Sequence, residues 1–81
     1  MNKTLIFTVG AGRAFWKLPT DVQEALNRKL YLYGLTGEGD VKRMIGADAL
    51  RLRDGEYRVV FEETATALII VAVGHRRAIY R

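Results

Sequence analysis

The stretch LRLRDGEYRVVF (Leu50–Phe61) decides the fold, because it is typical of a β-hairpin. Apolar and charged residues alternate on both sides of Asp54-Gly55, as in two half-buried strands. Asp-Gly is also a strong signal for a two-residue turn. With the turn there, Arg51 lies directly opposite Arg58. Like charges in that position destabilise a sheet by a few tenths to about 1 kcal/mol, so the pair needs an explanation.

The predicted register gives the hairpin two different faces, since cross-strand partners share a face and the face alternates at every residue. The apolar face, expected to pack on a helix, carries Leu50, Leu52, Tyr57, Val59 and Phe61. The other face carries Arg51, Arg53, Glu56, Arg58, Val60 and Glu62. This second face is either the solvated side of the sheet or an anion site. Arg58→Ala is expected to leave the fold intact or to stabilise it slightly, because it relieves repulsion.

The amino-terminal half predicts a strand followed by helices. TLIFTV (Thr4–Val9) is rich in β-branched and aromatic residues. A short helix can precede Pro19. A longer amphipathic helix is expected over Asp21–Tyr33, with Thr20 as its N-cap and Gly34 as its end.

The carboxyl-terminal half predicts three strands. The third, ALIIVAVG (Ala67–Gly74), is continuously apolar, as in a central strand covered on both faces. The 81 residues contain no linker or repeat, so they form one domain over residues 1–81. The expected fold is α+β: a strand, one or two helices and three strands, in a small antiparallel sheet. The helices pack on one face, and the other face is open and basic.

Composition excludes several function classes. There is no cysteine and only one histidine, His75, so a disulfide, a thiolate site or a zinc site is not expected. No apolar run is long enough for a signal sequence or a membrane span, which predicts a soluble cytoplasmic protein. The net charge is +4, and seven of the eight basic residues after position 41 are arginine. Arginine suits planar recognition of phosphate, so nucleic acid is a candidate partner.

The chain ends in GHRRAIYR (Gly74–Arg81), which adds a histidine, three arginines and a tyrosine. Either Arg76 or Arg77 joins the basic face of the hairpin. A four-residue turn over 63–66 favours one of them and a five-residue turn the other.

Together these segments resemble the RelE/ParE superfamily of toxins from bacterial type II toxin–antitoxin systems. The resemblance rests on a basic-hydrophobic-Gly segment (Val41–Gly46), Leu-Arg-Leu-Arg, a short turn, Tyr-Arg-Val, an apolar strand and Gly-His-Arg-Arg-x-x-Tyr. It implies a strand, two helices and three or four antiparallel strands. It also implies an antitoxin partner, whose flexible segment wraps the toxin.

The resemblance leaves three functions open. RelE-like members cut messenger RNA in the ribosomal A site, whereas ParE-like members inhibit DNA gyrase without chemistry. A degenerate toxin would serve only as a co-repressor that reaches operator DNA through its antitoxin. Two departures from the nuclease pattern favour the alternatives: GADAL lacks the upstream lysine of some RelE nucleases, and the tail stops at Arg81.

For the nuclease we predict metal-independent action without a cofactor, because the sequence shows no cluster of metal-binding residues. The implied catalytic residues are Arg51, Arg58, Arg76 and Tyr80. Further phosphate-binding candidates are Lys42, Arg43, Arg53, His75 and Arg77. The 2′-OH of the RNA attacks the neighbouring phosphate, the arginines stabilise the charge, and Tyr80 donates a proton to the leaving oxygen or stacks on a base.

Overall fold

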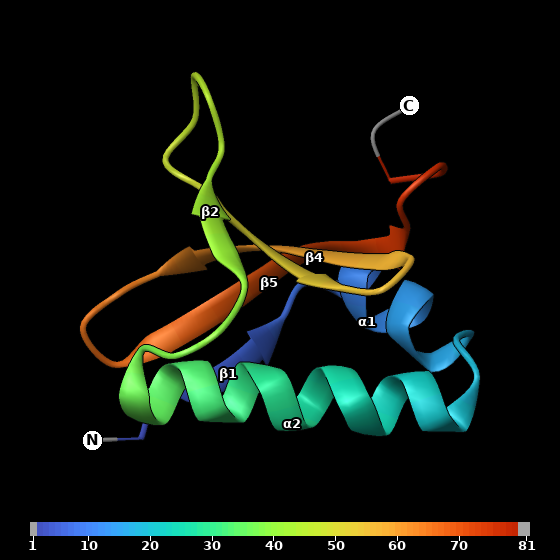
Figure 1. Ribbon diagram of the computed structural model, residues 1–81, viewed down its shortest axis with the longest axis horizontal. Coiled ribbons are helices and arrows are strands. Elements are labelled where there is room, and N and C mark those ends of the chain that lie inside the picture. The colour runs from blue at the N-terminus through green and yellow to red at the C-terminus, as the bar shows by residue number, and fades with distance from the viewer. Residues whose placement is uncertain (1, 80–81) are drawn as a thin grey trace.

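The computed structural model describes residues 2–79 and has the predicted α+β class (Figure 1). The elements in chain order are β1 (Thr4–Phe7), α1 (Val9–Trp16), α2 (Thr20–Thr36), β2 (Val41–Arg43), β3 (Leu50–Asp54), β4 (Tyr57–Glu63) and β5 (Ala67–His75). The predicted order of one strand, two helices and a hairpin followed by a last strand is confirmed, and β2 is additional. Neither helix in this part of the chain has the length and apolar composition needed to cross a membrane.

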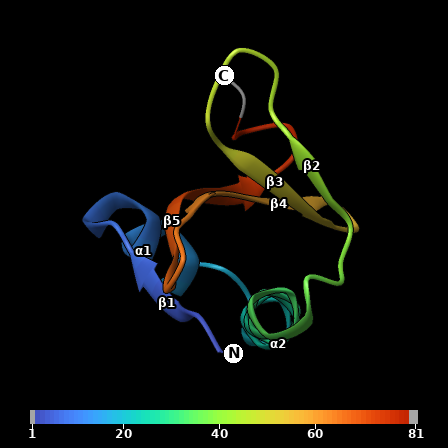
Figure 2. The same ribbon diagram turned by 90° about the vertical axis from the view of Figure 1, so that its left-hand side faces the viewer.

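The five strands form one sheet in the order β1-β5-β4-β3-β2 (Figure 2). The pairs β2–β3, β3–β4 and β4–β5 are antiparallel, whereas β1 pairs with β5 in parallel. The expected all-antiparallel sheet is therefore mixed. β5 lies between β1 and β4, which agrees with its prediction as an internal strand, although the helices cover only one of its faces rather than both.

The residues of the edge strand β2 were not predicted as a strand, because VKR is too short to show a period, although the family resemblance allowed for a fourth antiparallel strand. It is defined by its pairing with β3, in which Lys42 lies opposite Arg51. Two backbone hydrogen bonds flank this pairing: Met44 N–H donates to the Ala49 carbonyl at 2.9 Å, and Arg53 N–H donates to the Asp40 carbonyl at 3.0 Å.

The helix boundaries differ from the predictions at both ends of the helical segment. The first strand ends at Phe7 rather than Val9, because Thr8 caps α1: its hydroxyl accepts the Ala11 N–H at 3.2 Å. The N-cap of α2 is Pro19, and Thr20 is already helical.

The long helix α2 continues through Gly34 and ends at Gly37. Gly37 has a φ of 79°, and its N–H donates to the Tyr33 carbonyl at 2.8 Å. Gly34 is buried, and a Cβ there would lie 3.4 Å from Lys3 Cβ and 3.6 Å from the Leu68 side chain. The missing side chain lets α2 pack closely on the sheet, which is why this glycine lies inside the helix.

The hairpin register is shifted by two residues from the prediction. The turn is formed by Gly55 and Glu56, so Arg53 rather than Arg51 lies opposite Arg58. Gly55 has a φ of 57°, whereas Glu56 does not have a positive φ. This combination is typical of a type II′ turn, which has glycine at its first central position. Asp54 is thereby kept in β3, where it binds Lys29 of α2 at 2.6 Å.

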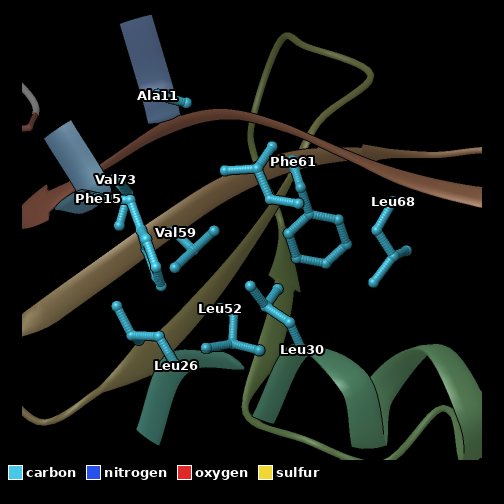
Figure 3. Close-up of a cluster of buried hydrophobic side chains, with 10 residues drawn as sticks. Ala11, Phe15, Leu26, Leu30, Leu52, Val59, Phe61, Leu68 and Val73 are labelled. Atoms are coloured by element: carbon cyan, nitrogen blue, oxygen red, sulfur yellow. The ribbon is translucent and has the colours of Figure 1, made fainter. Parts of the chain in front are cut away.

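A shift of two residues preserves the faces, because the side-chain period of a strand is two. The apolar face is as predicted: Leu52, Val59 and Phe61 are fully buried, and Leu50 and Tyr57 pack against them. Leu26 and Leu30 of α2 lie beneath this face (Figure 3). Ala11 and Phe15 of α1 belong to the same cluster, so both helices pack on one side of the sheet.

One extra residue in β5 keeps its apolar face on the core. Val60 pairs with Ala72 and Phe61 with Ile70, so Val71 forms a β-bulge. Without it, strict alternation would place either Ile70 or Val73 on the opposite face from the core.

A polar cluster joins the start of the chain, α2 and the end of β4. Lys3 Nζ donates to Glu63 Oε2 at 2.6 Å and to the Thr64 carbonyl at 2.7 Å, and the Tyr33 hydroxyl donates to Glu63 Oε1 at 3.0 Å. The hydrogen bond from Lys3 holds the pKa of Glu63 below its usual value. Burial raises the pKa of Tyr33, and its bond to Glu63 adds to that shift.

This cluster predicts a loss of stability in acid. Since the folded pKa of Glu63 lies below the ordinary 4.5, its contribution is complete above pH 4.5 and disappears as the pH falls through the lowered value. Glu63→Gln should therefore cost about 1 kcal/mol at pH 7 and almost nothing at low pH. Thermal unfolding of both proteins from pH 7 to pH 3 measures this. A difference that stays constant over that range would contradict the role given to Glu63.

Candidate nucleic-acid interface

The sheet face opposite the helices, here called the open face, carries most of the predicted site. The loop between β2 and β3 and the segment after β5 both rise from this side, away from α2 (Figures 1 and 2). The strand pairings arrange the open face in three rows of cross-strand neighbours. The middle row is Lys42, Arg51, Val60 and Ala72; the row toward the hairpin turn is Arg53, Arg58 and Gly74; the row at the far end is Glu62, Ile69 and Ile6.

Lys42 and Arg51 are the central cations of the open face. They are direct cross-strand partners, so two positive side chains lie next to each other. No carboxylate in residues 2–79 pairs with either of them. They border an open pocket of about 400 Å³, whose other lining residues are Arg43, Met44 and Ile45. Two adjacent cations at a pocket are suited to bind a phosphate through charge-assisted hydrogen bonds.

Arg58 has a structural role that the sequence did not reveal. It is only 9% exposed, and its Nη1 donates to the carbonyls of Gly55 at 2.6 Å and Tyr57 at 2.9 Å. The guanidinium therefore closes the hairpin turn. Five N–H groups belong to an arginine head, so Arg58 keeps donors for an anion as well.

These contacts reverse the expectation for Arg58→Ala. The like charge opposite Arg58 is Arg53 rather than Arg51, and Arg53 lies 3.8 Å from Asp40. The variant would leave the carbonyls of Gly55 and Tyr57 without their charged donor. We expect a loss of about 1–3 kcal/mol in the free energy of unfolding. Arg53→Ala is the matched control, because it removes the arginine that lies opposite Arg58. The side chain of Arg53 is 61% exposed, so its loss should change stability by less than about 0.5 kcal/mol. Chemical denaturation compares the two, and equal effects would contradict the turn-closing role.

Two further arginines already have acidic partners. Arg53 lies 3.8 Å from Asp40, and Arg76 Nε lies 2.5 Å from Glu56 Oε2. The backbone N–H of Arg76 also donates to the Glu56 carbonyl, which continues the β4–β5 register by one pair. That register places Arg76 rather than Arg77 on the side of Arg58.

Two of the predicted phosphate-binding residues belong to the helix side of the sheet. Arg43 pairs with Leu50 of the apolar face, although it borders the pocket. His75 pairs with Tyr57, and their rings contact edge-on with centroids 5.7 Å apart. The Nδ1 atom of His75 accepts the Arg77 N–H at 3.2 Å. Strand alternation thus separates His75 from Lys42 and Arg51, and Arg77 is exposed after the strand end.

The segment after β5 turns back over the open face. Gly74 has no side chain, and a Cβ there would lie 4.0 Å from Ile79 Cβ. Tyr80, the predicted proton donor, lies outside the described residues. Met44, Ile45 and Glu62 were not selected from the sequence as site residues, although strand alternation already placed Glu62 on the basic face.

The described part of the chain holds no group of three or more histidine or acidic side chains arranged for a metal ion. What the open face offers is positive charge in a fixed arrangement beside a pocket. Such a surface can hold a phosphodiester and stabilise additional charge on it.

Comparison with known proteins identifies the fold. Neither a protein-family model nor a curated protein sequence matches the chain. A chain of the toxin–antitoxin complex RelBE2 from Mycobacterium tuberculosis is 26% identical with a TM-score of 0.77, over 94% of this chain and 100% of that one. E. coli toxin RelE, solved in the free state as a mutant, is 26% identical with a TM-score of 0.77, over 96% of this chain and 87% of that one. A chain of the RelB–RelE complex from Methanococcus jannaschii is 21% identical with a TM-score of 0.77 over 93% and 94% of the two chains, which shows the fold alone.

The two helices on one face of a mixed sheet, with a basic face opposite, make the chain similar in fold to the small toxin domains of toxin–antitoxin systems. Within that class it is RelE-like, as the sequence resemblance predicted.

Proposed function

We propose that the chain is the toxin of a type II toxin–antitoxin pair and cuts messenger RNA on the ribosome. The observation that carries this proposal is the pair Lys42 and Arg51, which lie side by side at a pocket without an acidic partner among residues 2–79. The similar structures are RelE proteins, so the gyrase-inhibitor alternative has no comparable support.

The pocket supports binding of the scissile phosphate. Lys42 and Arg51 would hold its two non-bridging oxygens, and the remaining donors of Arg58 would reach it from the turn end of the open face. In the reaction the 2′-oxygen forms a bond to phosphorus, and the bond from phosphorus to the 5′-oxygen breaks. The products are a 2′,3′-cyclic phosphate and a free 5′-hydroxyl. Negative charge grows on the non-bridging oxygens as the first bond forms, so fixed cations there lower the barrier.

Two proton transfers complete the step: one proton leaves the 2′-OH, and one reaches the 5′-oxygen. Tyr80 is the proposed donor to the 5′-oxygen, from the family resemblance. Tyr80→Phe, which keeps the ring and removes the hydroxyl, should lower the rate if the hydroxyl donates and leave it almost unchanged if the ring only stacks on a base.

A cognate antitoxin is the proposed partner, because similar structures come from complexes with RelB antitoxins. In that complex the toxin would be inactive and would reach operator DNA only through the antitoxin. Lys42 and Arg51 also suit the carboxylates of an acidic antitoxin segment.

The test uses the purified chain, freed of antitoxin, with ribosomes stalled on a defined message. Mapping the new 5′ ends should show cuts at a fixed position within the codon in the A site. The same message without ribosomes and a gyrase supercoiling reaction serve as comparisons, and both should be unaffected. An intact message together with blocked supercoiling would replace this proposal by gyrase inhibition.

A further inference from the structure

Among the strand residues of the open face within residues 2–79, one carboxylate has no ion-pair partner, and the proposed reaction needs a base. Glu56 pairs with Arg76 and Asp40 with Arg53, whereas Glu62 is exposed and pairs with no cation in residues 2–79. We infer that Glu62 is the general base that takes the proton from the 2′-OH. The inference rests on the proposed function, whose reaction it completes.

The orientation of Glu62 follows from two independent observations. In the β4–β5 register Glu62 lies opposite Ile69, and its neighbour Glu63 lies opposite the buried Leu68. Glu63 binds Tyr33 of α2, so Glu63 points to the helix side. Because adjacent residues of a strand point to opposite faces, Glu62 points to the open face.

Glu62 is within side-chain reach of the proposed phosphate site. Its same-face neighbour along β4 is Val60, which is the cross-strand partner of Arg51. Glu62 and Arg51 are therefore diagonal neighbours, whose backbone separation in a sheet is about 7–8 Å. Arginine and glutamate side chains span this distance with room for one bound oxygen between their heads.

The position of Glu62 along the strands places its carboxylate on the side of the phosphate from which the 2′-oxygen would attack. The rows of the open face run from the turn end, with Arg58, through the middle row, with Arg51, to the far end, with Glu62. A displacement at phosphorus brings the attacking oxygen in on the side opposite the leaving oxygen. If the phosphate lies at the middle row and the 5′-oxygen toward the turn, the 2′-OH faces Glu62.

The proton balance is simple. The Glu62 carboxylate takes the proton of the 2′-OH as the 2′-oxygen bonds to phosphorus, and the 5′-oxygen leaves with a proton from the proposed acid. Solvent then returns the carboxyl group of Glu62 to its ionised form. Unlike Glu62, His75 cannot reach the same oxygen, because it lies on the other face.

The surroundings of Glu62 contain few other groups that titrate. Across from it, β5 presents Ile69 and β1 presents Ile6, neither of which is charged. By strand pairing, the nearest charged residues are Arg51 on β3 and Lys42 on β2. The loop between β2 and β3 adds Asp48, which directly precedes Ala49.

The experiment compares single-turnover cleavage of a ribosome-bound message by the wild type, Glu62→Gln and Glu63→Gln. Glu62→Gln should cut about 10²–10⁴-fold more slowly, the range of general-base effects, with unchanged ribosome binding and unchanged melting temperature. Glu63→Gln removes the adjacent carboxylate from the helix side and should cut at the wild-type rate under conditions where it is folded.

A Glu62→Gln variant that cuts within threefold of the wild type overturns the inference and leaves the proposed nuclease standing. A wild-type chain that makes no cuts on ribosomes overturns the proposed function, and the inference with it. Weaker ribosome binding by Glu62→Gln at an unchanged cleavage step would make Glu62 a binding residue and also overturn the inference.

Discussion

Arg51→Ala is expected to lower the rate of message cleavage at least 100-fold while the melting temperature stays within about 2 °C of the wild type. Arg51 occupies the middle row of the open face, next to Lys42 and at the pocket, and no carboxylate in residues 2–79 neutralises it. Loss of one fixed donor to a developing oxyanion typically costs 10²–10³ in rate. Single-turnover cleavage and thermal unfolding measure the two quantities.

The control for Arg51→Ala is Arg13→Ala, which removes the same charge from an exposed position on α1. Arg13→Ala should keep the wild-type rate. If both variants lost activity equally, the requirement would be for net positive charge rather than for an arginine at the pocket. Arg51→Lys is expected to fall between wild type and Arg51→Ala, because lysine keeps the charge but not the planar donors.

Phe61→Ala is expected to remove about 3–5 kcal/mol of stability, the largest structural effect that we predict. Phe61 is fully buried, and its ring contacts that of Tyr33 with centroids 5.5 Å apart. It also lies beside the β-bulge that aligns β4 with β5. A domain of this size is stable by only about 4–12 kcal/mol, so the variant should lose a large part of its stability.

Chemical denaturation of Phe61→Ala beside Ile45→Ala tests this prediction. Ile45 is also a large apolar residue, but it is fully exposed, and its loss should change stability by less than about 0.5 kcal/mol. Similar losses for the two variants would contradict the packing described for the core.

The faces of the hairpin were predictable from sequence because alternation depends only on a period of two. That period placed Arg51, Arg58 and Glu62 on one side and Phe61 on the other, and the structure confirms it. The turn position was not predictable in the same way. The sequence carries Asp54-Gly55 as a turn signal, but the ion pair between Asp54 and Lys29 depends on where α2 packs.

Other parts of the structure depend on contacts between segments far apart in the chain. The three-residue strand β2 and the parallel pairing of β1 with β5 are defined by their partners, not by their own composition. The bulge at Val71 is invisible in an apolar run, because every residue of that run fits either face. The position of His75 on the helix side of the sheet and the hydrogen bonds from Arg58 to the turn also depend on the strand register, which the sequence does not show.

The most direct test of the central claim is cleavage of a ribosome-bound message that carries a single 2′-deoxyribose at the nucleotide before the cut. If the open face acts by positioning a phosphate for attack by the neighbouring 2′-OH, the all-ribose message is cut at that position and the substituted message stays intact there. Cutting of the substituted message at the same position and rate would show that the RNA does not supply the nucleophile, and would contradict the mechanism built on Lys42, Arg51 and Glu62.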